Sequence, residues 1–446
     1  MKPLSLCLVL TAGLCLTPSA GAAEKTAAER GQLAVRGLSD MNPQSWSKRA
    51  YDEVWKRWGV KEKPADYGAA FRERYGLQAA PYDNGGLPMG MHVARGGKGL
   101  TVSCVLCHAG TVAGQTVIGL GNASLDLQGL FEEMFAAEGG FFVPPYQASL
   151  ARGTIDPVGP ILFLMEFRDP DLNLRSTIKL DRSPTLASDP PAWWLLKKKK
   201  TRNWTGGLDA RSARVDMATL LHPLNSPEHI KKQEGAFADI HAFVMSTQPP
   251  AYPFPVDRKL AEQGKGLFER TCARCHGTYG ADGTYPNKVV PLDALGTDPL
   301  LARSLTKKNV DYFNRSWFTQ QKGPDGKPYQ ISETEGYQAP PLDGVWATAP
   351  YFHNGSAPTV YHVLNSKARP RIFTRSYKTD RDAYDPVKLG WKVTVLEKAA
   401  APNLPGVERR RIYDTTRPGQ SNGGHVYGDK LTEDERRAVI EYLKTL

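Results

Sequence analysis

Four cysteines and two histidines occur in two copies of one short pattern, C-x-x-C-H. The two copies consist of Cys104, Cys107 and His108 (CVLCH) and of Cys272, Cys275 and His276 (CARCH). This spacing is the attachment signature of c-type haem. Two thiols one helical turn apart reach the two vinyl groups of one porphyrin, and the adjacent histidine is placed to bind the iron. The pattern therefore predicts two covalently attached haem c groups, with His108 and His276 as iron ligands.

Zinc binding and thiol redox chemistry are the other uses of paired cysteines. A zinc site would bring two pairs together or add ligands at short spacing, whereas these pairs are 168 residues apart. A thioredoxin-like pair needs no histidine after it and would not occur twice. No cysteine after Cys15 lies outside the two motifs. The haem interpretation is therefore favoured.

The first 23 residues resemble a secretory signal peptide. Lys2 precedes an apolar run from Leu4 to Leu16, and the small residues Ala20–Ala23 follow. The apolar run is too short to span a bilayer, and no later stretch approaches the required length. We therefore expect residues 1–23 to be removed and the chain to be periplasmic or secreted, without a membrane span; an uncleaved anchor is the alternative.

Composition limits the remaining possibilities. The chain has 446 residues, of which 23% are charged and 41% hydrophobic, proportions typical of a globular protein with two or three domains. Its 42 glycines and 34 prolines predict long loops. The net charge of +11 would fall to about +6 after loss of Lys2 and addition of four haem propionates. This is too weak a signal to predict a nucleic-acid partner.

A proline-rich stretch at 246–257, STQPPAYPFPVD, predicts an extended linker between two units, 24–250 and 256–446. Each unit contains one haem motif, so the expected fold is mainly α, with two cytochrome c-like domains and long loops. Helices are predicted over 46–58, over 227–245, from Asp257 into the second haem motif, and after a capping box of Thr432 and Glu435. Gly264 would allow the last two helices to pack closely. No strand alternation and no repeat beyond the haem motifs is evident.

The second axial ligand of each iron decides whether it transfers electrons or binds a small molecule. Because no methionine follows Met245, the second haem must take His353, His362, His425, a tyrosine or no ligand. His425 is favoured, since the glycine-rich loop QSNGGHVYG can approach a haem face, and His353 is its competitor. No candidate stands out for the first haem, which makes an open distal face plausible. Its possible ligands, each more typical of a structural role, are His92, His222, His229, His241, Met89, Met91, Met134 and Met217.

Aromatic and basic residues gather in the segment 190–217. Trp193, Trp194 and Trp204 would line the first haem's pocket or relay electrons, and Arg211 or Arg214 would polarise peroxide or pair with a propionate. The alternative is that these tryptophans are core residues and these arginines lie at the surface. The run Lys197–Lys200 is interpreted as a solvated face, with docking of an acidic partner as the functional alternative.

Four segments resemble the di-haem cytochrome c peroxidase superfamily, and within it the rubber oxygenase branch. In chain order they are LPMGMHVARGGKGLTVSCVLCHAG, GLFERTCARCHGTYG, LDGVWATAPYFHNGSAPTVYHVL and SNGGHVYGDKLTEDERRAVIEYLKTL. The resemblance implies that His276 and His425 bind the second iron and that His108 is the proximal ligand of the first, whose distal side would be reactive. Typical di-haem peroxidases have His/Met ligation at the second haem, from which this chain departs.

These observations predict an exported di-haem c-type oxidoreductase that activates peroxide or dioxygen at the first haem and holds or relays electrons at the second. The alternatives are a non-catalytic periplasmic electron carrier and a haem-based sensor. Trp194, Trp204 and Arg211 are the catalytic candidates. The expected partners are peroxide or dioxygen and a small redox protein or small-molecule electron donor. Calcium is compatible with the sequence, but no motif assigns it.

Overall fold

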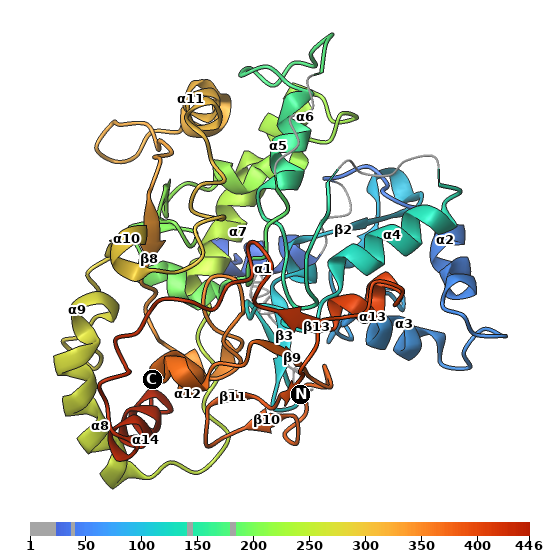
Figure 1. The fold of residues 1–446 in the computed structure, drawn as a ribbon. Coiled ribbons are helices and arrows are strands. Elements are labelled where there is room, and N and C mark those ends of the chain that lie inside the picture. The colour runs from blue at the N-terminus through green and yellow to red at the C-terminus, as the bar shows by residue number, and fades with distance from the viewer. Residues whose placement is uncertain (1–23, 37–40, 141–145, 179–183) are drawn as a thin grey trace, which may run out of the picture.

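The fold is known from a computed structural model that describes residues 24–36, 41–140, 146–178 and 184–446. The predicted signal peptide, 1–23, lies outside the described residues. Helices form groups at the periphery, and long irregular segments cross the middle of the molecule (Figure 1). The abundance of glycine and proline predicted these long connections.

The α-helices of the described residues are short, and most begin at a capping side chain. They are α1 (Ala27–Arg36), α2 (Lys48–Glu53), α3 (Tyr67–Tyr75), α4 (Leu127–Ala137), α5 (Gly159–Glu166), α6 (Pro227–Lys232), α7 (Glu234–Ser246), α8 (Arg258–Thr271), α9 (Ala273–His276), α10 (Leu292–Leu295), α11 (Lys307–Arg315), α12 (Val360–Leu364), α13 (Gly406–Arg410) and α14 (Glu433–Leu443). Asp257 caps α8 by accepting a hydrogen bond from the Leu260 amide, and Thr432 and Glu435 form the predicted capping box of α14. The helix predicted over 46–58 is divided into α2 and a 3₁₀ helix over Val54–Arg57, and the one over 227–245 is divided at Gln233.

Short strands, which the sequence did not predict, accompany the helices. All pairings are antiparallel: β1 (Met91–Val93) with β2 (Leu100–Val102), β3 (Ala109–Val112) with β4 (Gln115–Ile118), β5 (Thr201–Arg202) with β6 (Leu208–Asp209), β7 (Val289–Pro291) with β8 (Gly336–Gln338), β10 (Tyr384–Asp385) with β11 (Gly390–Trp391), and β9 (Ile372–Thr374) with both β12 (Thr394–Val395) and β13 (Ile412–Asp414). Strands of two to four residues are too short to show alternation in a sequence. The mainly α prediction holds, and the statement that no strands are evident is corrected by these short pairs.

Two helix pairs cross in the same way, α1 on α7 and α8 on α14. At each crossing a glycine meets the partner's backbone. A Cβ on Gly31 would lie 1.9 Å from the Asp239 carbonyl oxygen, and one on Gly264 would lie 1.9 Å from that of Ala438. Both glycines end the short sequence A-E-x-G, at Ala28–Gly31 and Ala261–Gly264. This internal repeat was missed in the sequence.

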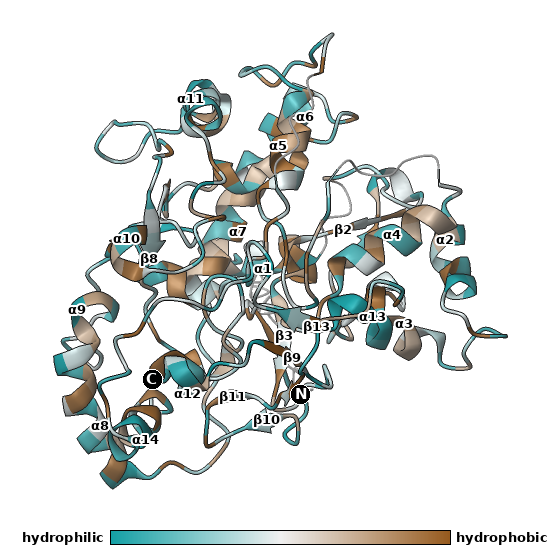
Figure 2. Cartoon of the chain, in the orientation of Figure 1, coloured by the Kyte–Doolittle hydropathy of each residue, from teal (hydrophilic) through white to brown (hydrophobic). Residues whose placement is uncertain are grey.

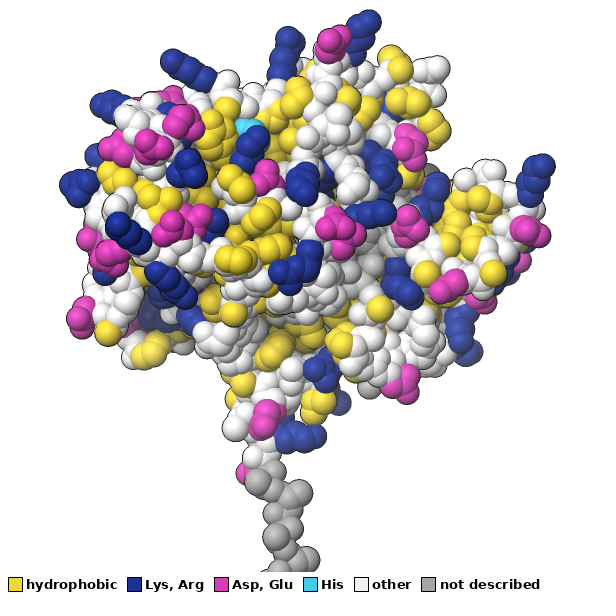
Figure 3. Space-filling model, turned by 90° about the horizontal axis from the view of Figure 1, so that it is seen from below, with side chains coloured by type: hydrophobic (Ala, Val, Ile, Leu, Met, Phe, Trp, Pro, Cys, Tyr) yellow, Lys and Arg dark blue, Asp and Glu magenta, His cyan; other side chains and the backbone are white. Residues whose placement is uncertain are grey.

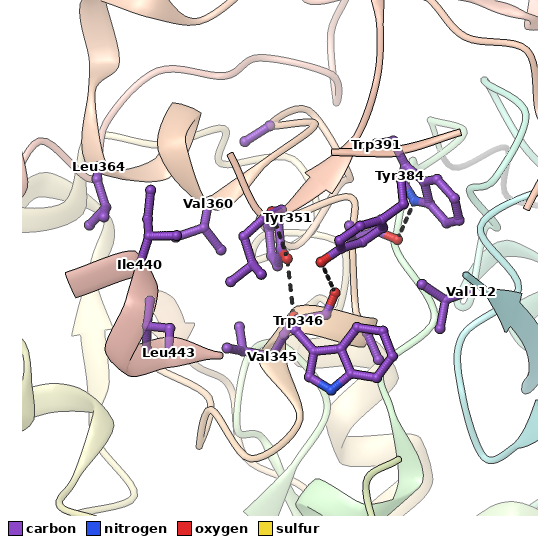
Figure 4. Packing of buried hydrophobic residues seen from close by; sticks show 14 of the residues in the cluster. Val112, Val345, Trp346, Tyr351, Val360, Leu364, Tyr384, Trp391, Ile440 and Leu443 are labelled. Atoms are coloured by element: carbon purple, nitrogen blue, oxygen red, sulfur yellow. Dashed lines mark hydrogen bonds between the residues drawn. The ribbon is translucent and has the colours of Figure 1, made fainter. Parts of the chain in front are cut away.

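The largest buried cluster joins residues from both sides of the predicted boundary. Val112 and Trp194 pack there with residues of the C-terminal half, including Trp346, Tyr384 and Leu443 (Figure 4). Segment 247–257 is free of helix and strand, as predicted, but its Phe254 ring stacks on Tyr384 with centroids 5.6 Å apart. The helices that cover the core are amphipathic, with hydrophobic and hydrophilic residues along the same ribbon (Figure 2). The linker is therefore packed against the core, and the two predicted units share buried surface.

Candidate haem-binding cavity

Both C-x-x-C-H motifs open onto one cavity of about 1240 Å³. All six motif residues line it: Cys104, Cys107, His108, Cys272, Cys275 and His276. The volume exceeds the roughly 300–1,000 Å³ of a pocket for one small molecule. Aromatic and aliphatic side chains form most of the wall, including Trp46, Phe131 and Phe163. The cavity is therefore large and apolar, as a site for porphyrins would have to be.

The first motif begins in a 3₁₀ helix over Cys104–Leu106, and His108 follows immediately before β3. The Nδ1 of His108 lies 3.2 Å from the carbonyl oxygen of Pro191, and the Trp193 ring stacks on the imidazole with centroids 5.4 Å apart. Burial lowers the pKa of His108 to about 4. The ring is therefore neutral, and Nδ1–H donates to the carbonyl while the Nε2 lone pair remains available to a metal.

The second motif is presented by α8, whose last turn leads through Cys272 into α9. The Nδ1 of His276 lies 2.8 Å from the Pro340 carbonyl oxygen, the same arrangement as at His108. The ring of His425 lies 6.2 Å from that of His276, measured between centroids. Two imidazoles bound through Nε2 on opposite sides of a metal, at about 2.0 Å each, would have centroids about 6.3 Å apart. This separation fits a bis-histidine site.

The motif cysteines are free thiols. Burial raises the pKa of Cys104 and Cys107 to about 12 and that of Cys272 to about 11, so these thiols are protonated. Paired thiols, neutral histidines with fixed Nδ1 atoms, and a cavity that reaches all six residues match the requirements of haem c. The residues present therefore fit this group.

The other two histidines considered for the second haem, and the methionines considered for the first, make contacts of other kinds. His353 also lines the cavity, but its ring stacks on Tyr337 with centroids 4.0 Å apart. His362 is bonded through Nδ1 to the Thr359 hydroxyl at 2.8 Å. The methionines considered for the first haem are buried in the core, as their default interpretation predicted: Met89, Met91, Met134 and Met217. His425 is thus the histidine whose ring the fold brings near that of His276.

The structure corrects part of the prediction for segment 190–217. Trp193 and Trp204 line the cavity, whereas Trp194 lies fully buried in the core, where its Nε1 donates to the Asp343 carbonyl at 2.7 Å. Arg211 is exposed and pairs with Asp209, its neighbour two residues away. Arg214, in turn, pairs with Glu234 and lies over the Trp317 ring. Neither arginine lines the cavity, because each is held by a carboxylate outside it.

Several charged residues of the cavity wall were missed in the sequence, among them Asp189, Lys199 and Arg202. Lys199 belongs to the run interpreted as a solvated face, but burial lowers its pKa to about 8. Arg202 is 9% exposed and donates to Asp216 from Nη1, while its buried Nε and Nη2 have no hydrogen-bond partner. The run KKKKTR gave no sign of this, because consecutive polar residues carry no pattern that separates a buried side chain from its exposed neighbours. Its fifth and sixth residues form β5.

Three further features concern the described residues alone. No group of three or more His, Cys, Asp or Glu side chains in this part of the chain is placed to hold a metal ion. No helix there is long and apolar enough to cross a membrane. On the face seen in Figure 3, basic side chains are interspersed with acidic ones. That face therefore lacks the continuous basic surface typical of nucleic-acid binding.

Comparison with known families gives one match. Residues 336–374, from β8 to β9, match the family described as RoxA-like, cytochrome c-like. The matched range contains the whole segment LDGVWATAPYFHNGSAPTVYHVL and confirms the resemblance predicted from the sequence. The matched range includes Pro340, whose carbonyl oxygen accepts the hydrogen bond of His276.

Two curated relatives come from Sinorhizobium fredii (strain NBRC 101917 / NGR234). The uncharacterized protein y4iM is 29% identical over 297 residues, which cover 58% of this chain and 64% of the relative. The uncharacterized protein y4iJ is 29% identical over 261 residues, 45% of this chain and 41% of the relative. The chain thus spans less than two thirds of either relative.

Two solved structures are also similar. Hydrazine synthase of Kuenenia stuttgartiensis has 12% identity and a TM-score of 0.28, covering 68% of this chain and 96% of that one. A MauG-like protein associated with microbial copper homeostasis has 17% identity and a TM-score of 0.28, covering 69% and 94%. At these TM-scores neither defines the arrangement of this fold.

Proposed function

Since the chain contains a RoxA-like cytochrome c segment at 336–374, we propose that it is an exported di-haem c-type cytochrome that acts as an oxidoreductase. The observation that carries the proposal is the shared cavity, onto which both C-x-x-C-H motifs open. The matching crossings of α1 with α7 and of α8 with α14 support two cytochrome c-like units, 24–250 and 256–446. Periplasmic or secreted localisation rests on the leader-like residues 1–23.

Each of the two motifs would hold one haem c. Cys104 and Cys107 would attach the first through thioethers, with His108 as its axial ligand, and Cys272, Cys275 and His276 would do the same for the second. Haem c supplies an iron that exchanges single electrons and that binds peroxide or dioxygen where an axial position is open. His425 would occupy the second position opposite His276, which favours electron storage there.

The proline carbonyls orient the two axial histidines. Each Nδ1–H donates to a carbonyl oxygen, of Pro191 for His108 and of Pro340 for His276. This hydrogen bond fixes the tautomer and ring plane and makes Nε2 more basic. The Trp193 ring on His108 further restricts rotation of that imidazole. Both histidines are thus prepared for metal binding by neighbours on the chain.

A continuous series of bonds connects the two histidines through one tryptophan. Pro191, the acceptor of His108, lies two residues after Asp189, whose carbonyl accepts the Nε1–H of Trp204 at 2.8 Å. The Trp204 carbonyl accepts the Gln338 amide at 2.7 Å, and Gln338 lies two residues before Pro340, the acceptor of His276. This series supports Trp204, which also lines the cavity, as the relay between the haems.

The cavity wall near the first motif would exclude water and would provide one hydrogen-bond donor. Its aromatic side chains include Phe131, Phe135 and Phe163. His222 accepts the Leu224 amide through Nδ1 at 3.2 Å, so its proton is held at Nε2. His222 is thereby a candidate hydrogen-bond donor to peroxide or dioxygen. A small redox protein or a small molecule would supply the electrons.

The test is spectroscopy of the purified holoprotein. We expect two haems per chain in a pyridine haemochrome assay, one low-spin and one high-spin signal, and binding of cyanide or carbon monoxide at one haem. A protein with only low-spin haem, inert to cyanide, carbon monoxide and peroxide, would instead be an electron carrier. A protein that binds these ligands without turnover would be a sensor, and one without haem would refute the whole proposal.

A further inference from the structure

Asp189 is a buried acid in the wall of the cavity whose carboxyl group has no hydrogen-bond donor among the described residues. The residue is only 7% exposed. Its backbone is held at both ends, because its amide donates to the His353 carbonyl at 2.8 Å and its carbonyl accepts from Trp204. The backbone at Asp189 is therefore fixed, and the residue lies in the cavity wall.

Another buried aspartate of the chain, Asp126, has a full set of hydrogen-bond donors around its carboxyl group. Asp126 is fully buried, but the Arg410 guanidinium donates to both of its oxygens, at 2.7 and 3.3 Å, and the Gly129 amide donates at 2.9 Å. Asp189 has no comparable set of donors. An ionised carboxylate without hydrogen bonds is costly to bury, so such a group takes up a proton when its surroundings allow.

The groups around Asp189 act in opposite directions on the balance between its carboxylate and its carboxylic-acid form. Arg375 is the cation that acts on it, and this guanidinium favours the carboxylate. The phenols of Tyr351 and Tyr413 interact with it electrostatically from the other packed segments, and His353 is a neutral neighbour because burial lowers its pKa to about 3. Burial opposes Arg375 and raises the pKa of Asp189 well above its usual range. One further negative charge nearby would favour the acid.

Asp189 also lies at the centre of the connection between the two haem motifs. It is two residues from the acceptor of His108 and is hydrogen-bonded to Trp204, the proposed relay. Negative charge added at either haem motif would therefore act on an acid in the wall of the cavity that both motifs share. We propose that the Asp189 carboxyl takes up one proton when the haem pair gains one electron, and releases it when that electron leaves.

This inference rests on the proposed function, which supplies the electron through a small redox protein or a small-molecule donor. In this proposal Asp189 is a carboxylate in the oxidised protein, where the Arg375 guanidinium favours the charged form. One electron from the donor and one proton from solvent, entering through the cavity, give the reduced protein with a carboxylic acid. The new bond is the O–H bond of Asp189, and oxidation reverses both transfers. Neutralising the added charge in this way makes the reduced state easier to reach.

The test is a redox titration of the holoprotein at several pH values. For wild type we expect a midpoint potential that falls with rising pH, by at most about 59 mV per pH unit for one proton per electron. In Asp189→Asn, which keeps both backbone hydrogen bonds, the slope should decrease to what other groups such as the propionates contribute. Asp343→Asn is the matched control, since Asp343 lines the cavity but pairs with Lys198 at 2.7 Å. Its slope should equal that of wild type.

Equal slopes for wild type and Asp189→Asn, with two haems bound in each, would overturn the inference and leave the proposed function intact. Absence of haem would instead refute the proposed function. If Asp189→Asn does not fold, infrared difference spectra of wild type decide the question. Reduction should produce a carboxylic-acid carbonyl band, which shifts in Asp189→Glu; a difference spectrum without such a band would exclude the proton uptake.

Discussion

The crossing of α8 and α14 offers a sharp test of the fold that presents the second haem motif. The perturbation is Gly264→Ala. The added Cβ would lie 1.9 Å from the Ala438 carbonyl oxygen, 2.4 Å from its carbon and 3.0 Å from the Val439 nitrogen. All three are backbone atoms of a helix and cannot move aside individually. The helices must therefore separate by about 1 Å before a Cβ fits.

The cost can be worked from this clash. Overpacking of a tight core interface costs about 1–3 kcal/mol, and a backbone clash belongs at the upper end of that range. Replacing glycine by alanine within a helix returns about 1 kcal/mol. We therefore expect Gly264→Ala to lower the free energy of unfolding by about 2 kcal/mol. Separation of the helices would also loosen buried Val439 and Ile440 of α14.

The matched control lies two residues along the same helix. At Gly266 an added Cβ would meet only the far end of the Arg270 side chain, at 3.4 Å. Gly266→Ala should therefore gain up to about 1 kcal/mol, because only the helix-propensity term remains. The two variants should differ by about 3 kcal/mol. Urea unfolding of the holoproteins, followed by circular dichroism, measures this difference. Equal stability of the two variants, or a more stable Gly264→Ala, would refute the assigned helix crossing.

Three further outcomes follow from the site and its surroundings. His425→Ala should turn the second haem high-spin while both haems remain attached, and an unchanged low-spin spectrum in the holoprotein would exclude His425 as a ligand. Asp126→Ala should destabilise the fold by about 3–5 kcal/mol in urea unfolding, because it leaves the buried Arg410 guanidinium without its main partner; a loss below about 1 kcal/mol would contradict this. Arg211→Ala should change stability by less than about 0.5 kcal/mol and leave the haem spectra unaltered, since its pair with Asp209 is exposed; an altered spectrum of the first haem would restore it as a cavity residue.

Signals that act over a few residues allowed the sequence to predict much of the helical framework. Asp257 and the pair of Thr432 and Glu435 cap their helices through neighbours three residues away. Gly264 was identified as a point of close approach because a glycine in a helix has no Cβ and lets the backbone of a partner helix come near. These features depend on spacing along the chain, and spacing is what a sequence records directly.

Features that depend on distant segments could not be predicted in this way. The paired strands are held by partners up to tens of residues away, as for β9 and β13, and are too short for a periodic pattern. Lys199 and Lys200 are neighbours with the same side chain, yet only Lys199 lines the cavity. Trp194 and Trp193 differ in the same way. Chemical type identified the candidates here, but only the packing of the far half of the chain selects among them.

The shared cavity also changes the meaning of the predicted boundary at 250–256. A linker rich in proline suggests two units that could act separately. Here, however, Trp204 and Asp189 of the first half are bonded to Gln338 and His353 of the second, and Trp194 lies in a core dominated by the second half. Cutting the chain at the linker would remove the partners of these buried groups and open the cavity wall between the motifs. The connection between His108 and His276 crosses the boundary at the hydrogen bond between Trp204 and Gln338. The proposed electron exchange would therefore need both halves of the chain, since neither half alone contains the whole connection.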